Sequence, residues 1–216
     1  MITAFLNLKG GCGKSTSAVH LCRFLLDKGK KVALVDADGQ ATSLAWITNL
    51  EEKIQKPAVF RLIEPDPIVD ELPVIAQGHD EVVVDGAGGL AEVQRAILLL
   101  ADVVLIPVQP STPDVFASAE AIKAVRRARQ IRNGVPKAFT FLTRVVPKTL
   151  LLNEARETLS EYADVPLLKT EIHQRQVVAD VMGQGTTLFD LKGNRAATEL
   201  ARQYRELFEE IGYGRA

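Results

Sequence analysis

A glycine-rich segment near the start of the chain has the residue types that hold the phosphates of a nucleotide. Residues 9–16 read Lys-Gly-Gly-Cys-Gly-Lys-Ser-Thr and lie between an apolar run, Ile2–Leu6, and a helical pattern, Ser15–Leu26. Glycine permits positive φ and close backbone approach, so successive N–H groups can point at phosphate oxygens beside a helix N-terminus. Here Lys14 would reach the β- and γ-phosphates, and Ser15 would offer its hydroxyl to Mg²⁺. A glycine turn with an incidental lysine is the alternative.

The loop departs from the common phosphate-binding pattern in two ways. That pattern has a glycine five residues before Gly13, where this chain has Leu8. A second lysine, Lys9, precedes the paired glycines. A lysine on the shoulder of the loop can point away from its own phosphates and towards a facing molecule. The segment therefore indicates nucleotide binding, with a second cation beside the phosphate-binding loop.

Two carboxylates follow the apolar run Val32–Val35, at the end of a predicted buried strand. They are Asp36 and Asp38, and Gly39 comes directly after them. Ligands of a parallel α/β sheet bind at the carboxyl ends of its strands, so both acids are expected near the phosphates. That position suits the handling of Mg²⁺ and water. The alternative is an Asp-Gly turn followed by a helix cap from Thr42 or Ser43.

A third carboxylate, Asp85, follows the apolar run Val82–Val84 and precedes three glycines within residues 86–89. An apolar strand that ends in aspartate is typical of a Walker B element. Mg²⁺ gives up its hydration shell reluctantly, so we expect Asp85 to hold the ion through water. The glycines would let the segment move in response to a γ-phosphate. A structural acid that caps the next turn is the alternative, although an unpartnered acid is costly to bury.

Short apolar runs alternate with helical patterns, which predicts an α/β fold: one doubly wound, mostly parallel sheet with helices on both faces. Several runs lack alternation of apolar and polar residues, as expected of strands covered on both faces. The predicted strands are Ile2–Leu6, Val32–Val35, Ala58–Leu62, Val82–Val84, Val103–Val108, Ala138–Thr143 and, more weakly, Leu167–Glu171. The predicted helices are Ser15–Leu26, Asp66–Gln77, Leu90–Leu100, Val115–Arg132, Leu150–Tyr162, Val177–Met182 and Asn194–Ile211, with starts at Asp114 and Asn194.

Composition limits the class of protein. The chain has 216 residues, 47% of them hydrophobic and 25% charged, and a net charge of -1, which is ordinary for one globular domain spanning residues 1–216. Two cysteines, Cys12 and Cys22, make no disulfide framework and no metal-ligand pattern, which favours a reducing cytosol. We find no signal peptide and no apolar run long enough to span a membrane.

The motif at residues 9–16 resembles the deviant Walker A box of the ParA/MinD superfamily of ATPases. With no helix-turn-helix domain ahead of the loop, the chain is most similar to the small plasmid-partition ParA (ParF-like) proteins. The resemblance implies a P-loop NTPase fold with ATP and Mg²⁺ as cofactors. It implies that Lys9 crosses a nucleotide-sandwich homodimer to the other subunit's phosphates, that Asp38 orients the hydrolytic water, and that Asp36 belongs to the Mg²⁺ shell. The family commonly has proline where this chain has Gly39.

The resemblance also implies the residues that contact the nucleotide. The catalytic residues are Lys9, Lys14 and Asp38, and the metal ligands are Ser15, Asp36 and Asp85. The nucleotide-binding residues are Lys9, Gly10, Gly11, Cys12, Gly13, Lys14, Ser15, Thr16, Pro110 and Arg144. Pro110 lies in a segment that approaches nucleotide and dimer interface, and Arg144 ends the strand near the adenine, although a surface arginine is an equal alternative. Residues 172–177 resemble a region flanking nucleotide and DNA surfaces.

Two sets of basic side chains could face DNA. The first, on one predicted helix and just after it, is Lys123, Arg126, Arg127, Arg129, Arg132 and Lys137; a solvated helix face is its alternative. The second contains the residues that we predict to bind DNA, Lys169, Arg175, Lys192 and Arg195, together with Arg202 and Arg205. One copy would hold few phosphates. Two copies in an ATP dimer would hold more, because affinity rises with each phosphate neutralised.

These observations and the resemblance predict a cytoplasmic, nucleoid-associated partition ATPase. ATP and Mg²⁺ would drive a dimer that binds DNA without sequence preference, and a centromere-binding ParB- or ParG-type adaptor would stimulate hydrolysis and release. A MinD-like membrane-positioning ATPase is an alternative, disfavoured because residues 206–212 are acidic rather than basic. Positioning of carboxysomes, chemoreceptor arrays or conjugative DNA is another. A ligase or iron-sulfur reductase of the same superfamily is a third.

Overall fold

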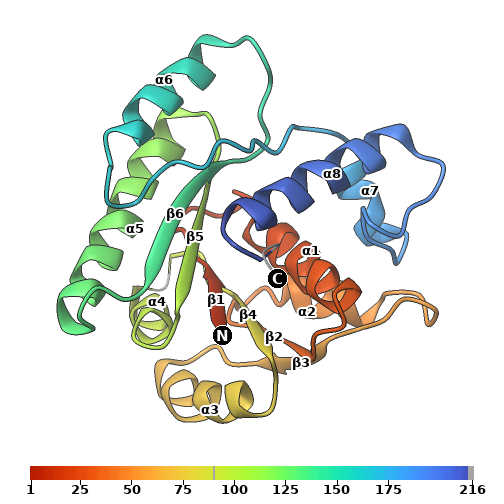
Figure 1. Cartoon of the computed structure of the whole chain (residues 1–216), viewed down its shortest axis with the longest axis horizontal. Helices are drawn as coiled ribbons and strands as arrows, with labels where there is room; N and C mark the ends of the chain where they lie inside the picture. Colours follow the sequence, from red (N-terminus) through yellow and green to blue (C-terminus); the bar gives the residue numbers. More distant parts are fainter. Residues whose placement is uncertain (90, 214–216) are drawn as a thin grey trace.

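A computed structural model describes residues 1–89 and 91–213 and places six strands in one sheet (Figure 1). All strand pairs are parallel, in the order β3-β2-β4-β1-β5-β6. The strands are β1 (Ile2–Phe5), β2 (Val32–Asp36), β3 (Ala58–Arg61), β4 (Glu81–Asp85), β5 (Val103–Val108) and β6 (Lys137–Leu142). The predicted doubly wound α/β fold is confirmed.

Helices cover both faces of this sheet. In the described part of the chain they are α1 (Lys14–Asp27), α2 (Thr42–Thr48), α3 (Pro65–Gln77), α4 (Ala91–Leu98), α5 (Thr112–Ile131), α6 (Leu150–Ser160), α7 (Val177–Gly183) and α8 (Arg195–Glu210). Helices α3 to α6 share one apolar core with Ala4, and α1, α2, α7 and α8 share the other with Phe5. Successive strand residues point to opposite faces of the sheet. Helices cover both faces, so the residues on both are buried and no alternation of apolar and polar residues is visible in the sequence.

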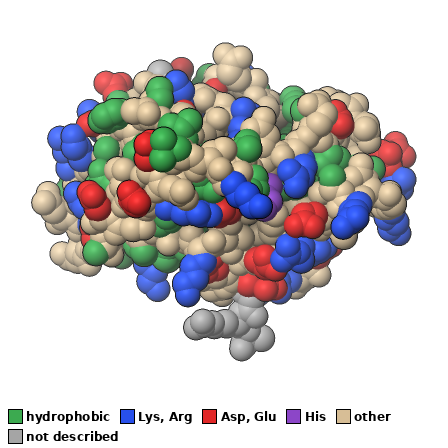
Figure 2. Space-filling view, turned by 90° about the horizontal axis from the view of Figure 1, so that it is seen from above, with side chains coloured by type: hydrophobic (Ala, Val, Ile, Leu, Met, Phe, Trp, Pro, Cys, Tyr) green, Lys and Arg blue, Asp and Glu red, His purple; other side chains and the backbone are tan. Residues whose placement is uncertain are grey.

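The register of the central strands brings the predicted site together. Phe5 of β1 pairs with Asp85 of β4, and Asp36 of β2 pairs with Asp85 on its other side. The loop of residues 9–16 leaves the end of β1, so it emerges beside both acids. Figure 2 looks down on this edge, at which the strands end. Residues far apart in sequence thereby form one site.

Gly86, directly after β4, is required by close backbone packing. Its N–H donates to the Phe5 carbonyl oxygen at 3.0 Å. A Cβ at this position would lie 2.7 Å from that oxygen and would collide with the Leu6 side chain. Glycine therefore lets β4 leave the sheet tightly against the end of β1, and the Asp85 side chain stays fixed beside the loop.

Two expectations about secondary structure need correction. The weak strand Leu167–Glu171 is wrong: only a single parallel bridge, Thr140 with Leu167, forms there. Pro166 has no N–H to donate, and the N–H groups of Lys169 and Thr170 donate to the Glu210 carboxylate instead of to a strand. The start of α5 at Asp114 is also wrong, since the helix begins at Thr112 with Ser111 as N-cap.

Helix α2 was not predicted from the sequence. Its seven residues are too few for a periodic signal, and its N-cap, Ala41, has a left-handed φ of 51° and no capping side chain. The cap comes from Asp36 on β2, which accepts from Leu44 N at 2.8 Å. The predicted cap at Asn194 is confirmed, because its side chain accepts from Ala197 N. Leu90, the predicted start of the helix observed as α4, lies outside the described residues, as do residues 214–216.

The substitution Gly86→Ala should lower the free energy of unfolding by about 1–3 kcal/mol, because the new methyl group must displace backbone. Gly183→Ala is the control, since a Cβ there meets nothing within 4 Å. It should change stability by no more than about 0.5 kcal/mol. Urea unfolding of both variants measures the difference, and equal midpoints would contradict the packing argument.

Candidate functional site

The loop of residues 9–16 presents an open helix N-terminus. Gly11 and Gly13 have φ of 76° and 96°, values that other residues rarely adopt. Gly13 is the N-cap of α1 and no side chain caps that helix. The first N–H groups of α1 are therefore free for an external acceptor, and the helix dipole favours an anion there. This is the geometry of a phosphate site.

Side chains from neighbouring strands hold the loop in shape. Thr143, after β6, donates from Oγ1 to the Cys12 carbonyl oxygen at 2.8 Å. Gln109, after β5, donates from Nε2 to the Gly11 carbonyl oxygen at 2.8 Å. These carbonyls turn outwards to accept those bonds, which leaves the loop N–H groups facing the opposite way. The loop is therefore preorganised by strands that follow it in the sequence by about 100 residues or more.

The two loop lysines have different surroundings. Lys14 is only 5% exposed, and its Nζ donates to the Lys9 carbonyl oxygen at 3.0 Å across the loop. The Lys9 side chain is exposed. Lys14 thus lies within the phosphate cradle, as its predicted role requires. The accessible position of Lys9 is consistent with a target on another molecule, and the crossing itself stays a prediction.

Asp85 is the most unusual group of the site. Its side chain is fully buried, and neither carboxylate oxygen has a hydrogen-bond partner within the described structure. The pKa of Asp85 is raised to about 7, chiefly by burial and to a smaller extent by nearby Asp36, while the hydroxyls of Ser15 and Ser43 and the Lys14 ammonium partly offset this rise. An unpartnered buried carboxylate beside a hydroxyl offers the hard oxygen ligands that Mg²⁺ prefers. The predicted pair Ser15 and Asp85 therefore fits the ion.

The Asp36 carboxylate accepts hydrogen bonds from neighbouring residues of the protein. Its Oδ1 accepts from Asp38 N at 3.0 Å, and its Oδ2 accepts from Ser43 Oγ and Leu44 N, both at 2.8 Å. The carboxylate thereby shapes the loop after β2 and caps α2. The sequence offered a cap at Thr42 or Ser43 as an alternative, but the capping acid is Asp36 itself. Its place in the Mg²⁺ shell stays a prediction.

Asp38 connects two loops at the site. Its Oδ2 accepts from Gly88 N, in the loop after β4, at 3.2 Å. Its Oδ1 accepts from Gln40 N at 3.0 Å, which closes a turn within its own loop. The side chain is partly exposed, so a water molecule can reach it. This position suits the predicted role in orienting water, and it couples Asp38 to the glycines beyond Asp85.

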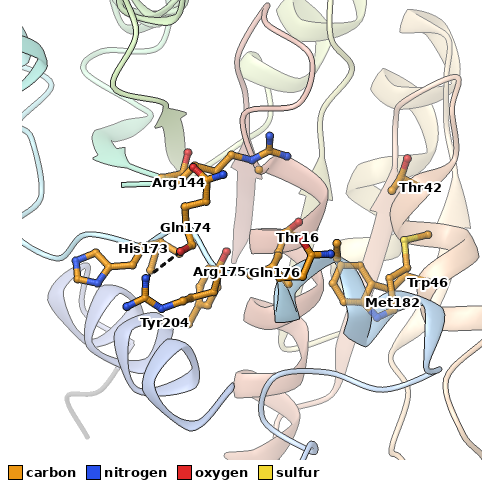
Figure 3. Close-up of a pocket in the computed structure, with 15 residues that line it drawn as sticks. Thr16, Thr42, Trp46, Arg144, His173, Gln174, Arg175, Gln176, Met182 and Tyr204 are labelled. Carbon is orange, nitrogen blue, oxygen red and sulfur yellow. Dashed lines mark hydrogen bonds between the residues drawn. The ribbon is translucent and has the colours of Figure 1, made fainter. Parts of the chain in front are cut away.

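A cavity of about 460 Å³ extends from the loop and provides room for a base and sugar (Figure 3). It is lined by Gly13, Thr16, Thr42, Trp46, Thr143, Arg144, Ile172, His173, Gln174, Arg175, Gln176, Val178, Ala179, Met182 and Tyr204. Thr16 and Arg144 lie where they were predicted to contact nucleotide. Arg175 also lines this cavity, and its contact with DNA stays a prediction. Pro110 lies beside Gln109, next to the loop, and is not a lining residue.

Sequence reasoning missed the support beneath this cavity. His20 of α1 contacts the Thr16 carbonyl oxygen through Nδ1 at 2.7 Å and accepts from Leu188 N through Nε2 at 3.1 Å. Burial lowers the pKa of His20 to about 4, so the ring is neutral and Nδ1 donates. It stacks on Tyr204 with ring centroids 4.9 Å apart and meets Trp46 edge-on. An apolar face containing one histidine gave no sequence signal for this role.

The first basic set is largely committed to structure. Arg126 forms a two-bond ion pair with Asp164 at 2.9 and 2.6 Å, and Arg129 donates to the carbonyl oxygens of Pro136 and Asp164. Arg132 donates to the carbonyl oxygens of Leu98, at the end of α4, and Ala101. These contacts engage the three arginines within the protein, and DNA binding by this set stays a prediction. Over residues 1–89 and 91–213, no helix combines the length and apolar character that a membrane span requires.

The second basic set is more accessible. Lys169, Lys192 and Arg195 are exposed. Arg202, by contrast, pairs with Glu199 and Glu206, and Arg205 lies over the Phe189 ring at 4.6 Å. The residues available for an anionic partner are therefore fewer than the sequence suggested.

Comparison with known proteins decides the family. A sequence profile of the CobQ/CobB/MinD/ParA nucleotide binding domain matches residues 3–188. The chain belongs to this family. Its resemblance to ParA/MinD proteins is thereby confirmed.

Similar proteins have names that indicate different roles. Maintenance of carboxysome distribution protein A of Halothiobacillus neapolitanus is 33% identical over 209 residues, 94% of each chain. The chromosome-partitioning ATPase Soj of Thermus thermophilus is 23% identical over an alignment of 243 positions that covers 96% of this chain and 94% of Soj. An ATP complex of a Cyanothece McdA variant has a TM-score of 0.77 at 17% identity and covers 98% of this chain and 96% of that one. The last likeness shows the fold.

The buried acid of this family member should make its stability depend on pH. Between about pH 4 and pH 7 the folded protein keeps a proton on Asp85 that the unfolded chain has released, so the free energy of unfolding falls as pH rises through this range. Asp85→Asn removes this titration. Without nucleotide, the variant should be more stable than the parent at about pH 8 by on the order of 3 kcal/mol, and the gain should vanish near pH 4.

Urea unfolding at several pH values measures this difference. Asp70→Asn, at an exposed position of α3, is the matched control and should show no such gain. Equal or lower stability of Asp85→Asn at about pH 8 would contradict the account of a desolvated carboxylate.

Proposed function

We propose that this protein is an ATPase of the ParA/MinD type that positions a cargo on DNA through an ATP-dependent homodimer. The observation that carries the proposal is the unpartnered, buried carboxylate of Asp85 beside the glycine loop and Asp38. Such a carboxylate is costly to keep unless an ion or proton compensates it. A magnesium nucleotide on the loop supplies the compensation.

Different residues of the site would bind the phosphates, hold the ion and orient the water. Bound Mg²⁺ would neutralise charge between the β- and γ-phosphates. The loop N–H groups and Lys14 hold the phosphate oxygens, and Ser15 and Asp85 hold the ion. Asp38 would accept a hydrogen bond from the attacking water and orient it towards the γ-phosphate. Catalysis of phosphoryl transfer rests mainly on such positioning and charge stabilisation.

Dimerisation places Lys9 at the second nucleotide. The exposure of the Lys9 side chain supports this step, because a cation on the outer side of the loop can reach a facing subunit. The dimer doubles the number of accessible basic groups, including Lys192 and Arg195. Since affinity for DNA increases with each phosphate neutralised, ATP then controls the binding of DNA. Hydrolysis, stimulated by an adaptor protein, returns the monomer.

The cargo has two candidates. Plasmid or chromosomal DNA, carried through a centromere-binding ParB- or ParG-type adaptor, is supported by the likeness to Soj. A carboxysome is supported by the 33% identity with the Halothiobacillus protein, which extends over 94% of both chains. The greater identity favours the carboxysome or a similarly large cargo over a plasmid. The chain would work in the cytoplasm, on the nucleoid, and not on a membrane.

The substitution Asp38→Ala should separate binding from hydrolysis. The variant should still bind ATP and form the dimer, while ATP turnover falls by about 100-fold or more because the water loses its acceptor. Gln40→Ala, two residues away and exposed, is the control and should retain turnover. Phosphate release with Mg-ATP and DNA measures the rate. Normal turnover by Asp38→Ala would remove this residue from the mechanism.

DNA binding should require ATP and accessible cations. Mobility shifts with a duplex of arbitrary sequence should appear with ATP and be weak with ADP or no nucleotide. Lys192→Ala with Arg195→Ala should lower the slope of log affinity against log salt by about 2–4, if each residue contacts a phosphate in both subunits. Arg127→Ala, at an exposed position of α5, is the control. Equal shifts in all three nucleotide states would defeat the proposed control by ATP.

A further inference from the structure

One buried side chain of α4 is polar. Gln94 is only 3% exposed, whereas the other buried residues of this helix are apolar and belong to the core on the face of the sheet opposite α1 (Figure 1). A buried amide is costly unless it forms hydrogen bonds. Its Nε2 donates to the Ala87 carbonyl oxygen at 2.8 Å, in the loop that follows β4. Leucine would fill a similar volume in this core, so the bond to Ala87 is what distinguishes the amide.

This bond holds one side of a peptide group whose other side holds Asp38. The carbonyl of Ala87 and the N–H of Gly88 belong to the same planar, trans peptide. The carbonyl accepts from Gln94, and the N–H donates to Asp38 Oδ2 at 3.2 Å. Because the C=O and N–H of a trans peptide point in opposite directions, fixing the carbonyl also fixes the direction of the N–H. Gln94 therefore acts on Asp38 through a single peptide group.

The same peptide lies against the phosphate loop. A Cβ at Gly88 would lie 3.7 Å from the Gly10 backbone and from the Leu8 carbonyl oxygen. Ala87 is only 1% exposed, so water cannot readily replace Gln94 at its carbonyl oxygen. The peptide thus lies between the phosphate loop and the acid that we predict to orient water.

The bond from Gly88 is important for the orientation of the Asp38 carboxylate. Among the described residues, two backbone N–H groups donate to this carboxylate, and only that of Gly88 comes from outside its own loop. The other, from Gln40, closes a local turn. Two bonds, one on each oxygen, fix the rotation of a carboxylate, whereas one leaves it free to turn. Loss of the Gly88 bond would therefore release Asp38 from its orientation.

We propose that Gln94 is a positioning residue for ATP hydrolysis, which holds the Asp38 carboxylate in place through the Ala87–Gly88 peptide. The inference rests on the proposed function, since it takes the role of Asp38 from there, and it extends the hydrolytic site to a side chain in the apolar core. Gln109 and Thr143 hold the phosphate loop independently of Gln94. Its effect is therefore on the rate of hydrolysis and not on nucleotide affinity.

The test compares two buried substitutions in the full chain, Gln94→Leu and Thr140→Val. Leucine cannot donate, so the Ala87 carbonyl loses its partner. Thr140 of β6 is also buried, and its hydroxyl has no hydrogen-bond partner within the described structure, so Thr140→Val is the matched change from polar to apolar in the core. Phosphate release with Mg-ATP and DNA gives kcat and KM. Urea unfolding confirms that both variants are folded.

We expect Gln94→Leu to lower kcat about tenfold or more and to leave KM within about threefold of the parent. Thr140→Val should match the parent in both. In the Asp38→Ala background, Gln94→Leu should cause no further loss, because both changes remove the same orienting contact. Losses that multiply in the double variant would show that Gln94 acts by another route and would overturn the inference. So would a kcat of Gln94→Leu equal to that of the parent.

A second measurement does not depend on hydrolysis. Hydrogen exchange of the Gly88 amide, followed by NMR without nucleotide, should become faster by about tenfold or more in Gln94→Leu and in Asp38→Ala, and should stay at the parent rate in Thr140→Val. An unchanged Gly88 amide in Gln94→Leu would overturn the inference and leave the proposed function intact. A parent that does not hydrolyse ATP would instead refute the proposed function, and the role of Gln94 with it.

Discussion

The buried carboxylate of Asp85 is the constraint on which the arrangement of the site depends. Parallel pairing of β4 with β1 and β2 holds it at the centre of the sheet edge, where water does not reach its oxygens. An acid in such a place raises the energy of the protein until a proton or cation joins it. Gly86 keeps the following backbone tight against β1, so the acid cannot relax outwards. Cation binding is therefore favourable at the position of this carboxylate.

The loops around that point belong to different strands but are tied to one another. Asp38 from the β2 loop meets Gly88 from the β4 loop, while Gln109 and Thr143 from the β5 and β6 ends hold the glycine loop. A ligand that shifts the glycine loop must therefore disturb bonds to the other loops. Each of these hydrogen bonds joins two backbone segments that lead to different helices. A change at the γ-phosphate can therefore alter the position of helices at the surface.

The surface of the site combines two kinds of interaction. Lys9 and the phosphate cradle provide charge, which gives strong but screened attraction to an anion. The exposed side chains of Phe116, Leu150 and Leu151 provide apolar area, whose attraction salt does not screen. With a net charge of only -1 the chain has no strong overall field, so local groups decide what binds. The ion pairs of Arg126 and Arg202 remove much of the basic character that a count of residues suggests.

The fold class, the glycine loop and the acids at strand ends were predictable from the sequence, because apolar runs, glycines and short-range spacing are local signals. The ends of most helices, such as the cap at Asn194, were predictable as well. Long-range packing was needed to show that Asp36 caps α2, that the N–H groups of Lys169 and Thr170 donate to Glu210, and that His20 and Trp46 support the cavity. It also put Arg175 at the cavity beside the glycine loop. These facts depend on contacts between residues far apart in the chain, whose partners no local pattern identifies.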